Sequence, residues 1–188
     1  MTTINALRTR LRTRLEESTA AVWSDAELDE CLTGALADYS ARFPAEAEAT
    51  ISVANGATFA TLPGEVLSMR RVISGDGVVI PSRGAPTGSA AGEELAWERF
   101  GDRLYFSRQL AAQTLTIWFR AMHDFSTLTA MDEELVILLA VAAALDARAI
   151  QDAKRGIPID RYLLQMARNT AERALDRRGR RLRVSALA

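Results

Sequence analysis

The fold is decided where the chain changes from strand to helix. Residues 114–121 have the sequence TLTIWFRA, and residues 132–150 have the sequence DEELVILLAVAAALDARAI. The first stretch places Leu115, Ile117 and Phe119 on one face of an extended chain, which predicts a half-buried β-strand. The second begins with three acids and is apolar nearly all round, which predicts a helix packed between other helices. The chain therefore contains both a sheet and a helical bundle.

Two helices are predicted before the strand region. The first has apolar residues three and four positions apart, at Ile4, Leu7, Leu11 and Leu15. The arginines at positions 8, 10, 12 and 14 fall on its other sides, and we expect them to form a solvated face. Ser24 with Glu27 three residues later is a capping box, which predicts the start of a second helix. Pro44 ends that pattern.

Residues 50–121 carry the signals of a small antiparallel sheet. Asn55-Gly56, Asp76-Gly77 and Gly101-Asp102 each lie between short apolar runs, and such pairs are typical of hairpin turns. Residues 82–92 are rich in Gly, Ser, Ala and Pro, which predicts a long exposed loop.

A fourth helix is predicted after Gly156 and Pro158. It runs from about Ile159 through Ala174 and continues into a segment rich in arginine. Its predicted apolar face consists of Tyr162, Leu163, Met166, Thr170 and Ala174. Gly179 is expected to end the helix.

The fold class is therefore α+β. We expect a bundle of about four helices with an inserted small antiparallel β-sheet or open barrel, followed by a flexible basic C-terminal tail. The predicted parts are an N-terminal helical pair (1–48), the β-domain (49–122), the C-terminal helices (128–178) and the arginine-rich tail (179–188).

Composition excludes several classes of protein. Of the 188 residues, 48% are hydrophobic and 25% are charged, which is typical of a globular chain. One cysteine and one histidine rule out a disulfide framework and a metal site built from a cluster of those residues. The longest apolar run, Leu135 to Leu145, is too short to span a bilayer. We expect no cofactor, no metal and no membrane partner.

Charge is distributed unevenly. The net charge of the chain is −1, but the segment from Arg173 to the end holds six arginines and a single acid. Three interpretations remain open for this basic end. It is a solvated helix end, a segment that docks in an acidic pocket of a protein partner, or an electrostatic contact to nucleic acid.

Catalytic signals are weak. His123 with Asp124 is compatible with acid–base chemistry, but no nucleophile is recognisable beside it, so a structural loop histidine is favoured. Cys31 falls among core positions and is interpreted as a buried apolar side chain. Glu133 and Glu134 are adjacent on a helix and do not face each other, so we interpret them as an N-terminal charge cap. We predict that the protein is not an enzyme.

Four stretches together resemble the head-to-tail adaptor (connector) proteins of tailed bacteriophages and related gene-transfer particles. They are residues 23–28 (WSDAEL), residues 62–67 (LPGEVL), residues 97–106 (WERFGDRLYF) and residues 117–119 (IWF) with the acidic helix start that follows. The resemblance extends from about Ile4 to Arg178.

This resemblance implies a structural virion protein without catalysis. Such adaptors form a ring, usually of twelve copies, under the portal protein. They extend the DNA channel, help to retain packaged DNA and offer a platform to the next tail component. DNA passes through the lumen without sequence-specific contact. The location implied is the head-tail neck of the virion, after assembly in the host cytoplasm.

Two groups of residues are candidates for contacts. The portal-docking candidates are Arg173, Arg177, Arg178, Arg180, Arg181 and Arg183. The loop candidates for contact with a ring neighbour or the tail are Arg83, Gly84, Pro86, Gly88 and Gly92. The alternative function is a nucleic-acid-binding module that uses the arginine-rich C-terminal tail.

Overall fold

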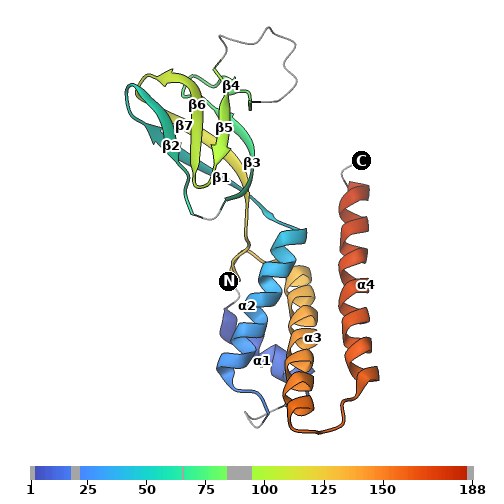
Figure 1. Cartoon of the computed structure of the whole chain (residues 1–188). Helices are drawn as coiled ribbons and strands as arrows, with labels where there is room; N and C mark the ends of the chain where they lie inside the picture. The colour runs from blue at the N-terminus through green and yellow to red at the C-terminus, as the bar shows by residue number, and fades with distance from the viewer. Residues whose placement is uncertain (1–2, 18–21, 65, 84–94, 186–188) are drawn as a thin grey trace. The chain divides into compact units, whose positions relative to one another are not determined.

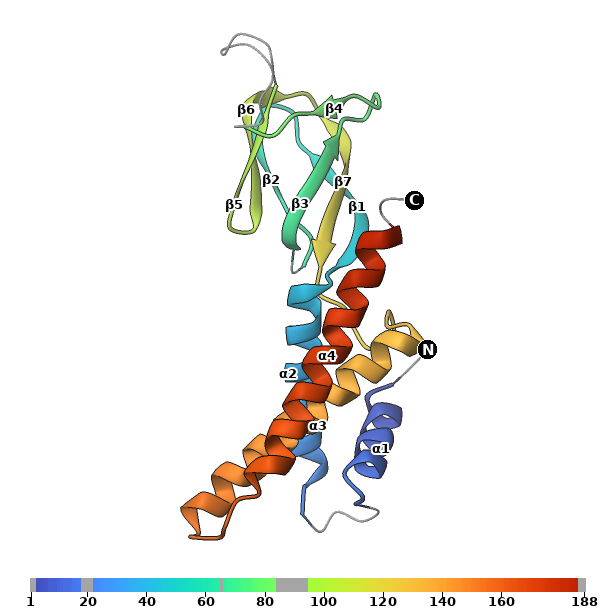
Figure 2. The ribbon, with the colours of Figure 1, turned by 90° about the vertical axis from the view of Figure 1, so that its right-hand side faces the viewer.

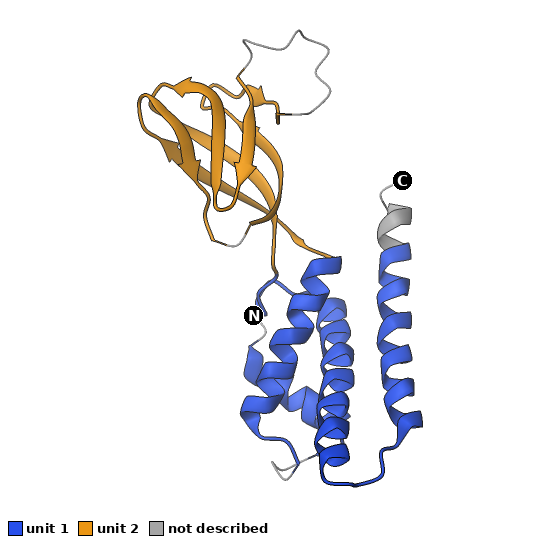
Figure 3. Ribbon diagram, in the orientation of Figure 1, with its two compact units in different colours: residues 1–42, 123–188 blue, residues 43–122 orange. Residues whose placement is uncertain are grey.

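The computed structural model describes residues 3–17, 22–64, 66–83 and 95–185, with side chains described as far as Arg180. The chain forms two compact units (Figure 3). Residues 1–42 and 123–188 form a helical unit, and residues 43–122 form a β unit.

In the helical unit, the part of the chain that the structure describes forms four helices (Figure 1): α1 (Ile4–Arg14), α2 (Asp25–Arg42), α3 (Ala130–Lys154) and α4 (Arg161–Ser185). Side chains cap the first three as the sequence specifies. The Ser24 hydroxyl accepts the Glu27 N–H while the Glu27 carboxylate accepts the Ser24 N–H, so the predicted capping box is confirmed.

Helix α3 is the centre of the helical unit. It packs against α1, α2 and α4, and Figure 2 shows α4 running along it. Fully buried side chains from three helices meet in the core; they are Leu7, Leu11, Leu28, Leu32, Tyr39, Val136, Ile137 and Ala140. The apolar composition of α3 follows from this central position.

The described residues of the β unit form seven strands: β1 (Ala45–Val53), β2 (Ala57–Thr61), β3 (Val66–Ile73), β4 (Val79–Ile80), β5 (Trp97–Phe100), β6 (Arg103–Leu110) and β7 (Gln113–Ala121). They form two antiparallel sheets, in the orders β1-β7-β3-β4 and β2-β6-β5. The inward residues of both sheets share one apolar core, in which Val72, Leu104, Leu115 and Ile117 are completely buried. The Trp97 indole N–H donates to the Ile80 carbonyl and so links the two sheets.

Two predicted hairpins are confirmed and one is wrong. Asp76-Gly77 joins β3 to β4, and Gly101-Asp102 joins β5 to β6. A turn does form at Asn55-Gly56, but β1 pairs with β7 and β2 pairs with β6, so this turn carries the chain from one sheet to the other. The Gly56 N–H is accepted by the Leu110 carbonyl, at the corner where β6 gives way to β7.

Helix α4 differs from its prediction in two respects. It continues through Gly179 as far as Ser185, because glycine lowers helix stability without forbidding the conformation. Its buried residues are Ala171 and Leu175, whereas Tyr162, Leu163 and Met166 of the predicted apolar face are exposed. The most deeply buried side of α4 is therefore not the predicted one, although Leu163, Met166, Thr170 and Ala174 of the predicted face line grooves that α4 forms with α3.

The arginines of α1 fit the predicted solvated face only in part, because Arg10 and Arg14 are exposed whereas Arg8 and Arg12 are largely buried, and all four pair with acids. Arg8 pairs with Asp25 and Asp29, and Arg12 pairs with Asp25 and with the buried Glu17. Arg10 and Arg14 pair with Glu133 and Glu134 of α3. Glu133 and Glu134 therefore neutralise the charges of Arg10 and Arg14, in addition to lying near the start of α3. The sequence analysis did not anticipate this, because the partners lie in other helices.

Candidate docking surfaces

The arginines of α4 that were predicted to dock on the portal differ in exposure: three are exposed, and one forms an ion pair within the helical unit. Arg173, Arg177 and Arg180 are exposed. The backbone of Arg181 and Arg183 continues the helix, and their side chains lie outside the described part of the chain. The exposed guanidinium groups line one side of the helix, because residues 173, 177 and 180 are three and four positions apart.

Arg178 is tied to the bundle instead. Its guanidinium lies 3.1 Å from a carboxylate oxygen of Asp132, whose side chain is only 4% exposed. The Thr129 hydroxyl donates to the same carboxylate at 2.6 Å. Arg178 therefore holds α4 against the start of α3 and is less available to a partner than the other arginines.

Tyr39 completes this polar cluster. Burial raises the pKa of Tyr39, and its hydrogen bond to Asp132 raises it further. Burial works against ionisation of Asp132, yet the hydrogen bonds from Thr129 and Tyr39 and the charge of Arg178 hold its pKa below the usual range. The cluster joins α2, α3 and α4 through an ionised carboxylate.

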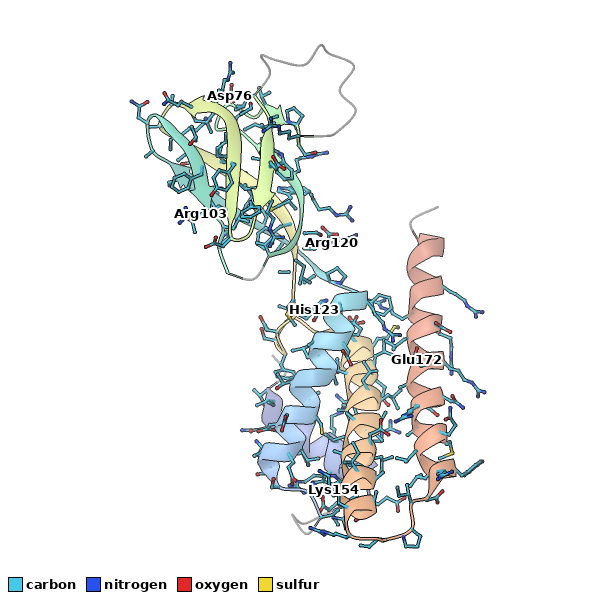
Figure 4. The ribbon with its side chains drawn as sticks, in the orientation of Figure 1. Asp76, Arg103, Arg120, His123, Lys154 and Glu172 are labelled. Atoms are coloured by element: carbon cyan, nitrogen blue, oxygen red, sulfur yellow. The ribbon has the colours of Figure 1, made fainter. Side chains whose placement is uncertain are left out.

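Two further ion pairs fasten α4. Arg42 of α2 contacts both carboxylate oxygens of Glu172, at 2.9 and 3.0 Å, and Arg168 lies 2.9 Å from Asp146 of α3. Glu172 is labelled in Figure 4. Hydrogen bonding to Arg42 lowers the pKa of Glu172. Such exposed pairs add little stability, so the packing of Ala171 and Leu175 carries most of the attachment.

Apolar grooves lie beside α4. One, of about 420 Å³, is lined mainly by apolar residues of α3 and α4 together with Leu15. A second, of about 240 Å³, lies farther along the same helix pair, between Met131 and Arg178. Exposed large apolar residues cluster at the turn between the two helices; they are Ile150, Ile157, Ile159, Tyr162, Leu163 and Met166. Clusters of this kind mark interaction surfaces.

The predicted contact loop is only partly described. Arg83 is exposed, and its guanidinium lies 3.8 Å from a carboxylate oxygen of Glu98. Gly84, Pro86, Gly88 and Gly92 lie outside the described residues. The loop stays a candidate on its sequence.

The sequence reasoning missed two exposed aromatic groups of the β unit. On the three-stranded sheet, the Phe59 and Tyr105 ring centroids lie 6.1 Å apart and Arg103 covers Phe59. On the other sheet, Trp118 lies beside Arg71. The sequence did hold a signal for this exposure. Side chains alternate between the two faces of a strand, and Phe59 and Trp118 occupy positions that alternate with the core-facing ones.

His123 has structural contacts. Its backbone N–H donates to the buried Ser40 hydroxyl at 3.0 Å, and its ring packs against Tyr39 with centroids 5.4 Å apart. The residue is labelled in Figure 4. It joins the end of α2 to the segment that returns from the β unit.

Burial, with the charge of Glu30, raises the pKa of the Cys31 thiol, which opposes thiolate chemistry.

A comparison with known protein families identifies the family of the chain. The family model described as SU10 adaptor protein matches residues 2–187, and the chain belongs to that family. The resemblance to head-to-tail adaptor proteins of tailed bacteriophages is thereby confirmed, and the protein is a structural adaptor of the virion. No curated protein shows a significant match to the chain.

One solved structure with similarity is titled "Neck of empty GTA particle computed with C6 symmetry". The identity is 21% and the TM-score is 0.28, over 74% of this chain and 76% of that one.

Within the described residues, no helix has both the length and the apolar character needed to cross a membrane.

Proposed function

We propose that the protein forms a ring under the portal protein, extends the DNA channel, helps to retain packaged DNA and supports the next tail component. Membership of the adaptor family is the observation that carries this proposal. Twelve copies, an assembly step in the host cytoplasm and a role without catalysis belong to the same proposal.

The exposed arginines at the end of α4 support a docking contact with the portal. Arg180 is exposed, and the helix continues beyond it through Arg181 and Arg183 to Ser185. Arginine pairs well with carboxylates on a protein partner. The overall charge of −1 supports a channel through which DNA passes without being held tightly.

Sedimentation with purified portal rings tests the proposal. We expect the wild-type protein to sediment with the portal as a saturable complex, near one copy per portal subunit. The triple variant Arg180→Gln/Arg181→Gln/Arg183→Gln should lose this binding. The matched control removes three exposed arginines outside the proposed contacts, Arg70→Gln/Arg108→Gln/Arg155→Gln, and should bind as the wild type does. Absence of wild-type binding at low salt would refute portal docking.

Duplex DNA in place of the portal tests the alternative function. A nucleic-acid module predicts that the logarithm of the association constant for duplex DNA falls linearly with the logarithm of the salt concentration. The slope should then be smaller in the triple variant of α4. The adaptor function predicts weak DNA binding that these three substitutions leave unchanged.

A further inference from the structure

We propose that, in the assembled ring, the outer face of α4 in one copy packs against the outer face of α2 in the next copy. The inference rests on the ring assembly proposed above and names the surfaces that would form it. It assigns Arg173 and Arg177 to the neighbouring copy and leaves Arg180, Arg181 and Arg183 for the portal.

The outer face of α4 is defined here by Tyr162, Met166, Arg173 and Arg177. Tyr162 is 79% exposed and Met166 is 48% exposed, although both are large and apolar. The four residues fall on one side of the helix, opposite the buried Ala171 and Leu175. Aromatic residues, methionine and arginine are the types enriched at protein interfaces.

The outer face of α2 is defined here by Glu30, Gly34 and Asp38, which follow one another at intervals of one helical turn. All three are exposed, and the buried side of the same helix is formed by residues such as Leu28, Leu32 and Tyr39. Within the described part of the chain, neither Glu30 nor Asp38 forms an ion pair, although the charge of Asp38 acts on Arg42 one helical turn away.

The charges of the two faces are complementary. The α2 face carries two carboxylates and the α4 face carries two guanidinium groups. Arg173 and Arg177 likewise have no carboxylate partner among the described residues. A second copy of this chain therefore supplies what each face lacks, and opposite charges set the register of such contacts.

The position of the two faces suits a ring. Helices α2 and α4 both pack on α3, and α3 lies between them in Figure 1. The two faces are therefore different surfaces. Within the α4 face, Met166 and Arg177 lie beside grooves shared with α3, whereas Tyr162 and Arg173 line neither groove. A closed ring needs this kind of heterologous pair, because each copy must present one patch to one neighbour and another patch to the next.

Gly34 leaves room for the neighbouring helix. A Cβ atom built at this position meets no other atom within 4 Å, so no contact inside the chain requires a glycine there. Glycine in the interior of a helix lowers its stability relative to alanine. Close approach of a second backbone gives this residue a role that the single chain does not.

Cysteine cross-linking on portal rings tests the interface. In a Cys31→Ser background, Gly34→Cys is combined in turn with Tyr162→Cys, Met166→Cys and Arg173→Cys, and the assembled particles are oxidised. We expect at least one pair to give a ladder of covalently linked copies that extends beyond dimers. The single-cysteine variants, as matched controls, should give no species larger than a dimer.

Charge reversal gives a second, independent readout. Arg173→Glu/Arg177→Glu and Glu30→Arg/Asp38→Arg should each reduce the copies bound per portal ring about tenfold, since like charges would then oppose each other. The variant with all four substitutions should recover most of the wild-type occupancy. All substituted residues are exposed, so circular dichroism of each free variant should match the wild type.

The outcomes separate this inference from the proposed function. If wild-type protein occupies portal rings but no cysteine pair gives a ladder and charge reversal leaves the occupancy unchanged, the interface is elsewhere and the adaptor function stands. If the single variants fail and the fourfold variant does not recover, the arginines contact a different protein and the inference is refuted. If wild-type protein does not bind portal rings, the proposed function fails first.

Discussion

The guanidinium of Arg178 in α4 lies 3.1 Å from the carboxylate of Asp132 in the first turn of α3. This pair is the least exposed of the three ion pairs described for α4, since Arg178 is 24% exposed and Asp132 is 4% exposed. Its position explains why one arginine of the basic segment behaves differently from its neighbours. It also makes the attachment of α4 open to measurement.

Replacement of Asp132 by asparagine should destabilise the helical unit. The substitution leaves the guanidinium of Arg178 without its charged partner in a largely buried place, which costs about 1–3 kcal/mol. Urea unfolding followed by helical circular dichroism measures the change. The matched control is Asp146→Asn, whose partner Arg168 is more exposed, with an expected loss of about 1 kcal/mol or less. Equal losses for the two variants would contradict a special role for Arg178.

The stability of the wild type should fall in acid partly because of Asp132. Its pKa in the folded protein is below the usual value, so the ionised form stabilises the fold above about pH 4. That contribution is lost as the pH falls through the folded-state pKa. Unfolding measured at several pH values should therefore show a flatter acid limb for Asp132→Asn. An unchanged slope would show that other carboxyl groups account for the acid sensitivity.

Leu175 and Leu163 should respond differently to truncation. Leu175 is 2% exposed on the buried side of α4, whereas Leu163 is 40% exposed. Leu175→Ala should cost about 2–4 kcal/mol, since it removes buried contacts and leaves a cavity. Leu163→Ala should cost about 1 kcal/mol or less. The reverse order in urea unfolding would mean that α4 packs through the face predicted from sequence.

Gly77 and Gly34 should respond to alanine in opposite directions. Gly77 has a φ of +85° in the turn between β3 and β4, a conformation that costs an alanine about 1–2 kcal/mol. Gly34 lies within α2 with free space around it, so Gly34→Ala should stabilise the free protein by about 0.5–1 kcal/mol. Thermal unfolding of the two free variants measures both effects. A destabilising Gly34→Ala would show that the glycine serves the fold of the single chain.

Sequence patterns predicted the elements better than their partners. The Ser24–Glu27 capping box and the Gly101-Asp102 turn depend on residues close in the chain, and both form as expected. The Asn55-Gly56 turn also forms, but a turn signal does not say which strand lies alongside. That choice depends on a core assembled from both sheets, which is information distant in sequence.

The candidate surfaces show a second limit of sequence patterns, which do not tell an exposed interface from a buried core. Tyr162, Leu163 and Met166 have the spacing of a buried helix face, and their exposure was not predictable from periodicity. A helix that meets a partner carries apolar residues on more than one side, and the sequence does not separate core from interface. The reverse happened in α1, where arginines assigned to solvent pair with acids on α2 and α3.

The connection between the units has a mechanical consequence. The chain enters the β unit after Arg42 and returns at His123, and the Ser40 hydroxyl holds the His123 backbone at the base of both passages. The first and last strands, β1 and β7, are neighbours in one sheet, with Ala45 opposite Ala121. Tension applied to the β unit is therefore shared by two parallel covalent tethers.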